Sequence, residues 1–183
     1  MTRLAVLASG SGTILEAMVA CGVPVDLLLA DRPCRALEVA AAAGVDGELV
    51  TRSSFGAAFD RVAYTAELVS ALARRGVEVV AMAGFMTVLA APMFEVYEGR
   101  VLNTHPSLLP AFPGAHAVRD ALAFGVKVTG CTVHIATVRM DDGPILAQEA
   151  VPVLTDDTEA ILHERIKAVE RHLYPAVVQE FLS

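Results

Sequence analysis

An amide and an imidazole lie two residues apart at the end of an apolar run in the stretch "VLNTHPSLLPAFPG", which spans Val101 to Gly114. An amide N–H and a protonated imidazole are both hydrogen-bond donors of the kind that stabilises a developing oxyanion. Three prolines follow, and because proline fixes φ and lacks a backbone donor, we expect them to stiffen the loop. A stiff loop suits preorganised chemistry, so the pattern favours Asn103 and His105 as half of an active site over a histidine that only packs in the core.

An acidic turn, "MDDGP" at Met140 to Pro144, lies between two strand-like runs further along the chain. Asp and Gly are common in turns for structural reasons alone, so the composition by itself does not indicate chemistry. A carboxylate beside an imidazole, however, favours the charged form of the imidazole and gives a pair that can move a proton. We therefore expect Asp141 to supply the other half of the site.

The glycine-rich stretch "ASGSGTIL", Ala8 to Leu15, lies where a first strand is expected to pass into a first helix. Backbone N–H groups at a helix N-terminus bind phosphate, and glycines let the backbone approach the anion. Leu15 occupies the place of the third glycine of a dinucleotide fingerprint, and the stretch lacks the Gly-Lys-Ser/Thr of a Walker loop. A cradle for a monophosphate and a plain tight turn remain equal alternatives on these residues alone.

The remaining histidines and the cysteines show no metal-ligand spacing. His134 belongs to a run whose alternate residues are apolar, so we expect it on the other face of that strand, toward a cleft or solvent. We expect surface or helix-capping positions for His116, His163 and His172. The cysteines are odd in number, widely spaced and set in apolar segments, so they are expected to be buried, inert thiols: Cys21, Cys34 and Cys131.

The size, hydropathy and charge of the chain argue against several classes of protein. Its 183 residues fit one domain, spanning residues 1–183, and are enough to bury a core. Although 55% of the residues are hydrophobic, no apolar run approaches the roughly 18 residues of a membrane helix, and the N-terminus does not resemble a signal peptide. The formal net charge of -7 disfavours nucleic acid, whose binding depends on cationic side chains. We therefore expect a soluble, cytoplasmic protein with no membrane or nucleic-acid partner.

Short apolar runs alternate with helical patterns over the first two thirds of the chain, which predicts a doubly wound, mostly parallel α/β sheet. The expected strands are Leu4–Ala8, Val25–Ala30, Glu48–Val50, Val77–Ala83 and a run that opens at Val101. The expected helices are one that opens at Thr13 and stops at Gly22, then Arg35–Ala43, and then Ala57–Arg75 with Ser53 or Ser54 as N-cap.

The last third of the chain follows a different pattern. Val128–Val138 and Ile145–Leu154 are strand-like runs whose connection is too short for a helical crossover, so they are predicted to form an antiparallel hairpin. Thr158–Leu182 has the pattern of a long amphipathic terminal helix, which Pro175 is expected to kink or split.

Four motifs together resemble the phosphoribosylglycinamide formyltransferases, also called glycinamide ribonucleotide transformylases, over essentially the whole chain. They are "LASGSGTIL" as the phosphate loop, "AGFM" at Ala83 to Met86, "LNTHPSLLPAFPG", and "MDDGPIL" as the DxGP turn. The resemblance implies a Rossmann-like formyltransferase fold and a metal-free transferase of purine biosynthesis and one-carbon metabolism. Its reaction would be direct transfer of a formyl group from 10-formyltetrahydrofolate to the amine of glycinamide ribonucleotide, through a tetrahedral intermediate. These two small molecules would be its partners, and the assembly a monomer or a homodimer.

The resemblance also implies a role for each matching residue. Asn103, His105 and Asp141 would be catalytic. The residues implied for the ribonucleotide are Gly10, Ser11, Gly12 and Thr13 for its phosphate, with Lys167 nearby, Glu170 for its ribose hydroxyls, and the Met86 carbonyl for its amine. The residues implied for the folate are Arg61, Met86, Thr87, Val88, Leu89, Val138, Arg139, Met140, Asp141, Asp142 and Gly143. Two departures, Ile14 for a usual Asn and Thr87 for a frequent Arg, are expected to affect affinity more than reaction.

Other functions stay open as alternatives to this transfer. A formyltetrahydrofolate hydrolase would share the catalytic residues but release formate to water. A formyltransferase acting on another amine, such as methionyl-tRNA or a nucleotide-linked amino sugar, would carry a further domain. A folate- or nucleotide-binding module without catalysis would keep the loop glycines but need not keep Asn103, His105 and Asp141 together, so their joint presence favours an enzyme.

Overall fold

One sheet of seven strands runs through the computed structural model, which describes residues 2–54, 56 and 59–183. The strands are β1 (Leu4–Ala8), β2 (Val25–Ala30), β3 (Asp46–Leu49), β4 (Val79–Met82), β5 (Val101–His105), β6 (Val128–Ile135) and β7 (Ile145–Pro152). Their spatial order is β3-β2-β1-β4-β5-β6-β7. Strands β1 to β5 are parallel, whereas β6 is antiparallel to both β5 and β7. The predicted antiparallel hairpin is therefore confirmed.

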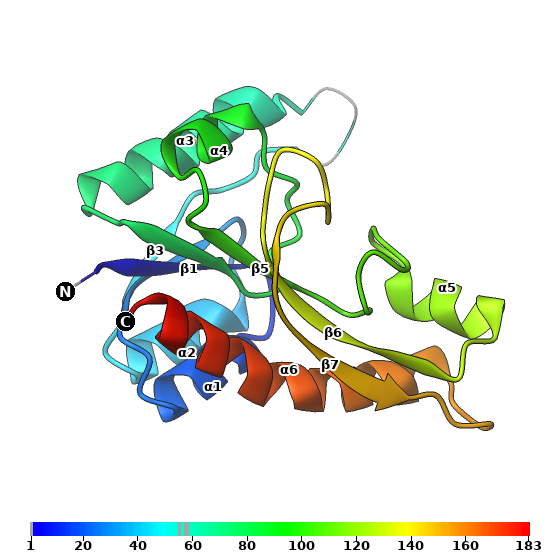
Figure 1. Cartoon of the computed structure of the whole chain (residues 1–183). Coiled ribbons are helices and arrows are strands. Elements are labelled where there is room, and N and C mark those ends of the chain that lie inside the picture. The colour runs from blue at the N-terminus through cyan, green and yellow to red at the C-terminus, as the bar shows by residue number, and fades with distance from the viewer. Residues whose placement is uncertain (1, 55, 57–58) are drawn as a thin grey trace.

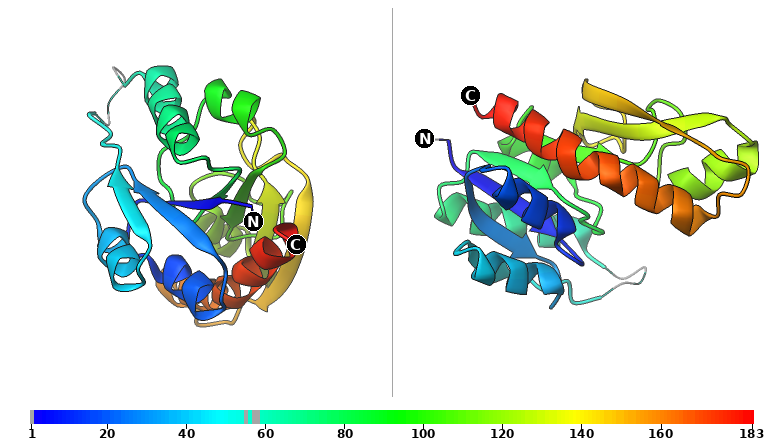
Figure 2. Two further views of the ribbon diagram at one scale, coloured as in Figure 1. Left: turned by 90° about the vertical axis from the view of Figure 1, so that its left-hand side faces the viewer. Right: turned by 90° about the horizontal axis from the view of Figure 1, so that it is seen from below.

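Helices cover both faces of this sheet (Figures 1 and 2). In the described part of the chain they are α1 (Thr13–Ala20), α2 (Arg35–Ala42), α3 (Arg61–Arg74), α4 (Ala91–Val96), α5 (Ala117–Phe124) and α6 (Glu159–Phe181). Helices α1, α2 and α6 pack on one face and α3 and α4 on the other, while α5 lies beside β6 and contacts α6. This arrangement confirms the predicted doubly wound α/β fold.

Strand β1 shows why the sheet needs helices on both faces. All five of its residues are fully buried, and successive side chains point to opposite faces. Leu4 and Val6 belong to the apolar cluster under α1 and α6, whereas Ala5 and Leu7 belong to the cluster under α3 and α4. A continuous apolar run is the sequence signature of a parallel strand covered on both sides.

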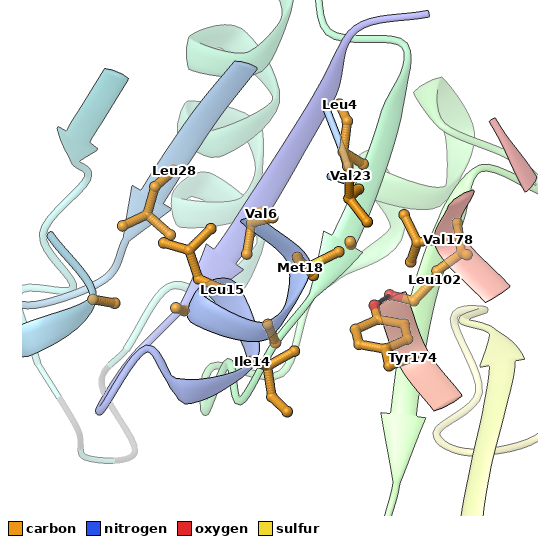
Figure 3. Close-up of a cluster of buried hydrophobic side chains, with 14 of the residues drawn as sticks. Leu4, Val6, Ile14, Leu15, Met18, Val23, Leu28, Leu102, Tyr174 and Val178 are labelled. Atoms are coloured by element: carbon orange, nitrogen blue, oxygen red, sulfur yellow. Dashed lines mark hydrogen bonds between the residues drawn. The ribbon is translucent and has the colours of Figure 1, made fainter. Parts of the chain in front are cut away.

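The terminal helix α6 is held against the sheet by an apolar face. Tyr174 and Val178 belong to the same buried cluster as Met18 and Leu102 (Figure 3). The Tyr174 hydroxyl donates a hydrogen bond to the Leu102 carbonyl over 2.9 Å. Helix α6 continues through Pro175, which is buried, so the predicted split at this residue is wrong. The helix is therefore one continuous element from Glu159 to Phe181.

Some predicted bounds are wrong. Helix α3 begins at Arg61, and the Asp60 carboxylate caps it by accepting the Ala63 N–H over 2.9 Å, so neither Ser53 nor Ser54 is the N-cap. Ala57 and its neighbour at 58, at the start of the predicted helix, lie outside the described residues. The sequence pattern also did not predict α4, a helix of one and a half turns. Within the described ranges, no helix is long and apolar enough to cross a membrane.

Candidate active site

A cavity of about 540 Å³ opens at the C-terminal ends of β1, β4 and β5 and extends to one face of α6. Strand order reverses between β1 and β4, and open α/β sheets bind ligands at such switch points. Of the residues to which the resemblance assigns a catalytic or binding role, those that line the cavity are Gly10, Ser11, Thr13, Met86, Thr87, Val88, Leu89, Asn103, His105, Val138, Met140, Asp141, Lys167 and Glu170.

Asn103 is held by a histidine on the neighbouring strand. The register of β5 and β6 places Asn103 opposite His134, and the Asn103 Nδ2 lies 3.2 Å from the His134 Nε2. The His134 Nδ1 lies 3.0 Å from the Ile135 carbonyl oxygen, which can only accept, so Nδ1 carries the proton and Nε2 accepts from the amide. Burial lowers the pKa of His134, in keeping with this neutral form. Asn103 thus has a fixed amide plane and a second N–H that can donate to a ligand.

His105 lies between two oxygen acceptors and is 5% exposed. Its Nε2 donates to the Phe112 carbonyl over 2.8 Å, and its Nδ1 lies 3.5 Å from the Asp141 Oδ2. The Phe112 carbonyl can only accept, so the His105 Nε2 carries a hydrogen, and the Nδ1 lies beside the Asp141 carboxylate. The predicted partners are therefore side by side, although 36 positions separate them in the chain.

The Asp141 carboxylate is fixed by the loop that it faces. Its Oδ2 accepts the Gly114 N–H over 2.7 Å, and its Oδ1 lies 3.8 Å from the His134 Nε2. Asp141 itself has a φ of 54°, a left-handed conformation that Asp tolerates better than most residues. A Cβ at Gly143 would overlap the Ile135 carbonyl, so the turn can close only with glycine at this position. The composition of the acidic turn thus has a structural cause as well as a chemical one.

The proline loop between β5 and α5 is bound to β6 through Thr132. The Thr132 hydroxyl donates to the Ser107 carbonyl over 2.6 Å and accepts the Leu109 N–H over 3.0 Å. Gly130 gives the loop room, because a Cβ there would lie 2.6 Å from a Leu108 methyl group. Thr132 is fully buried, and its role as an anchor for this loop was not evident from the sequence.

The glycine loop and α6 form the other end of the cavity. Gly10, Ser11 and Thr13 line it at the N-terminus of α1, and Lys167 and Glu170 line it from α6. Burial raises the pKa of Glu170, although a hydrogen bond with a threonine and nearby cations oppose the shift. This end therefore combines backbone donors, a cation and a carboxylate.

Gly12 has a packing role in the structure. It does not line the cavity, its φ is 73°, and a Cβ there would lie 2.8 Å from the Ala36 Cα. The glycine therefore lets α1 approach α2 while it begins the helix.

Several residues implied for the folate do not line the cavity. Arg61 is the first residue of α3, and Arg139 pairs with Asp142 over 2.9 Å on the surface. Gly143 contributes through the closure of the turn, as described above. The residues implied by the resemblance that lie outside the cavity lining are Gly12, Arg61, Arg139, Asp142 and Gly143.

Expectations for the other histidines and for the cysteines are partly wrong. His163 lines the cavity, and burial lowers its pKa, whereas a surface or capping position was expected. Cys21 is exposed and Cys34 is half-buried, so only Cys131 is the buried thiol expected from the sequence. Burial raises the pKa of Cys131 to about 12, which makes it a poor nucleophile. The other two histidines are as expected: His172 is on the surface, and His116 is exposed at the N-cap position of α5, where its side chain makes no capping bond.

Metal-binding groups were searched for in the part of the chain that the structure describes. No group of three or more His, Cys, Asp or Glu residues there could hold a metal ion. The lining of the candidate site consists of hydrogen-bond donors, the Asp141 and Glu170 carboxylates, the Lys167 ammonium and apolar walls.

The chain is similar to known proteins along nearly its whole length. A family model described as formyl transferase matches residues 2–178. A phosphoribosylglycinamide formyltransferase of Mycobacterium tuberculosis (strain H37Rv) is 47% identical over 181 residues, which cover 96% of this chain and 83% of that protein. The trifunctional purine biosynthetic protein adenosine-3 of Homo sapiens is 37% identical over 97% of this chain and 18% of its own length. The crystal structure of glycinamide ribonucleotide transformylase 1 from Symbiobacterium toebii has a TM-score of 0.92 and 44% identity, covering 99% of this chain and 87% of that one.

His134 is expected to make the free energy of unfolding depend on pH. Because burial lowers its pKa below the ordinary 6.5, the unfolded chain binds a proton more readily than the folded one just below that pH. The contribution of His134 is therefore fully present above pH 6.5 and is lost as the pH falls toward the lowered value. Urea unfolding of the wild type and of His134→Gln between about pH 5 and pH 8 measures it. The variant should lose less stability on acidification, and an identical pH dependence of the two proteins would contradict the assignment.

Proposed function

The chain belongs to the formyl transferase family, and on that premise we propose that it transfers a formyl group from 10-formyltetrahydrofolate to the amine of glycinamide ribonucleotide in purine biosynthesis. The observation that carries the proposal is the convergence of Asn103, His105 and Asp141 at one cavity. A phosphate-binding loop lies at one end of that cavity and apolar side chains at the other. Residues 1–183 act as one domain, and the two substrates are its small-molecule partners.

The apolar end of the cavity fits the flat ring system of a folate. Met86 and Val138 are each 65% exposed and Met140 is 55% exposed, and all three line the same cavity, so together they form an exposed apolar surface of the kind that marks ligand-binding grooves. The cavity is also lined by Val88 and by Thr87, which is buried as a whole residue. Backbone groups would bind the polar ring edges, and the apolar side chains would cover the ring faces.

The opposite end of the cavity suits the ribonucleotide. Backbone N–H groups of Gly10 and Ser11, at the N-terminus of α1, would bind the phosphate with the help of the Lys167 ammonium. Glu170 would accept hydrogen bonds from the ribose hydroxyls. Placed in this way, the amine of the ribonucleotide reaches the catalytic residues between the two ends.

Asn103 and His105 stabilise the charge that develops on the formyl oxygen during attack by the amine. Asn103, oriented by His134, offers its second N–H to that oxygen. The His105 ring is held by the Phe112 carbonyl at Nε2, so its donor would be the Nδ1–H, whose 3.5 Å contact with Asp141 is long enough to be shared with the formyl oxygen. Such donors act in a partly desolvated site, where loss of one typically costs about 2.7 to 4 kcal/mol in activation free energy.

Asp141 supports the reaction through His105 and through solvent. Its carboxylate lies 3.5 Å from the His105 Nδ1, and a water bound to it would relay a proton from the attacking amine to the departing nitrogen. The Met86 carbonyl would face the same amine as an acceptor. Transfer is direct, since the Cys131 thiol beside the cavity has a raised pKa and is unsuited to attack the formyl carbon.

Formyl transfer can be tested by mixing the protein with 10-formyltetrahydrofolate, with and without glycinamide ribonucleotide, while folate absorbance and formate are followed. We expect consumption of the folate only when the ribonucleotide is present, with no release of formate. Consumption without ribonucleotide would instead make the protein a hydrolase. If the folate is consumed in neither mixture, the result would favour a binding module without catalysis or a formyltransferase that acts on another amine.

Asp141→Asn tests the catalytic role of the carboxylate, because Asn has nearly the same size and also tolerates a positive φ. We expect kcat to fall at least about a hundredfold while folate affinity changes little, as for a group that acts on the transition state. Glu149→Gln is a matched control, since Glu149 pairs with His172 over 2.9 Å on the surface and outside the cavity. Equal kcat values for the Asp141 variant and the control would remove Asp141 from the mechanism.

A further inference from the structure

Asp31 is a fully buried carboxylate that directly follows β2 and does not line the cavity. The Arg32 guanidinium binds it through two nitrogens, at 2.9 and 3.0 Å. A buried charge is costly unless it is paired and hydrogen-bonded, so such a residue calls for a structural explanation. The mechanism above does not use this carboxylate.

Two hydroxyl groups also bind Asp31, and both belong to segments at the cavity. The Thr87 hydroxyl donates to the Asp31 Oδ2 over 2.7 Å, and the Ser9 side chain hydrogen-bonds to the same carboxylate. Burial raises the pKa of Asp31, but the bonds from Arg32, Thr87 and Ser9 outweigh it and hold that pKa below its ordinary value. Asp31 is therefore an ionised acceptor that joins β2 to two neighbouring loops.

Both of the side chains that bind Asp31, those of Ser9 and Thr87, are also connected to Met86. The Ser9 hydroxyl accepts the Met86 N–H over 2.8 Å, and Thr87 is the next residue after Met86. Phe85 is buried in the core under α3 and α4, whereas the Met86 side chain is exposed in the cavity. The backbone of Met86 is thus held on both sides by contacts that end on one carboxylate.

We propose that Asp31 is a positioning residue that, through Ser9 and Thr87, sets the direction in which the Met86 carbonyl faces the attacking amine. The inference rests on the proposed function, in which that carbonyl accepts a hydrogen bond from the amine of the ribonucleotide. The proposal also gives a role to Thr87, which stands where the resembling family often has Arg. Its hydroxyl is buried and donates to Asp31.

Asp26 provides a matched control for a merely structural role. It lies on β2, as a carboxylate that accepts the Leu4 N–H over 2.9 Å and pairs with Arg3 over 3.7 Å. It thus also binds an arginine and a backbone donor, but at the opposite end of the strand from the cavity. A loss caused only by weakened anchoring of β2 would be shared by Asp26→Asn.

The test compares Asp31→Asn with Asp26→Asn in steady-state formyl transfer. In Asp31→Asn we expect kcat to fall about tenfold or more, because small misplacements of a reacting group are costly. The KM for the ribonucleotide should change by less than about threefold, since its phosphate and ribose bind elsewhere. Asp26→Asn should keep the kcat of the wild type. Equal effects of the two substitutions on kcat would overturn the proposal.

Thr87→Val supplies a second variant in case Asp31→Asn does not fold. It removes the Thr87 bond to Asp31, together with the 3.3 Å bond that the same hydroxyl accepts from Arg52, while keeping the shape of the side chain. It should therefore show part of the loss in kcat, and Thr87→Ser should recover most of that loss. Thr87→Val with the kcat of the wild type would contradict the positioning role.

Amide hydrogen exchange at Met86 separates this inference from the proposed function. Exchange should be faster in Asp31→Asn than in the wild type and unchanged in Asp26→Asn, whichever reaction the protein catalyses. The wild type could fail to formylate the ribonucleotide while Met86 exchange is still faster in Asp31→Asn and unchanged in Asp26→Asn. That result would contradict the proposed function but support the role of Asp31 in holding Met86. Unchanged exchange in Asp31→Asn would overturn that role.

Discussion

A buried contact between the His105 imidazole and the Asp141 carboxylate joins the two parts of the chain that make the site. Both side chains are almost fully buried, and burying charged groups costs free energy unless they are paired and hydrogen-bonded. The Gly114 N–H donates to the carboxylate, and the Phe112 carbonyl accepts from the ring. The loop between β5 and α5 therefore gives each of the two side chains one further hydrogen-bond partner. The stiffness of this loop and the tight turn at Gly143 follow from the need to hold that contact.

The topology of the sheet explains how distant residues meet. Parallel strands β1, β4 and β5 end at the same edge, which brings the glycine loop after β1, the Met86 segment and Asn103 together. Strand β6 then runs antiparallel to β5, so that His134 lies opposite Asn103 and the turn after β6 returns Asp141 to the same edge. Asn103, His105 and Asp141, the residues proposed to be catalytic, consequently lie between the glycine loop at one end of the cavity and apolar side chains at the other.

The elements and motifs that depend on local sequence could be predicted, whereas long-range partners could not. Apolar runs and a glycine loop indicate strands and a helix start wherever they occur, which is why the bounds of β2 agree at both ends. The pairing of His134 with Asn103 depends on strand register, and the position of His163 in the cavity depends on how α6 packs. The hydrogen bond between Thr87 and Asp31 likewise joins residues 56 positions apart, so it could not be predicted from a local sequence pattern. Cys21 was expected in the core because its neighbours are apolar, but it lies at the end of α1, where the helix face turns to solvent.

The most direct test of the central contact is kcat for formyl transfer in His105→Ala, in Asp141→Ala and in the doubly substituted chain. If the carboxylate acts through the imidazole, the double variant should be no slower than the slower of the two single variants. Losses that multiply would mean that the two residues contribute independently, and would contradict a site organised around their contact.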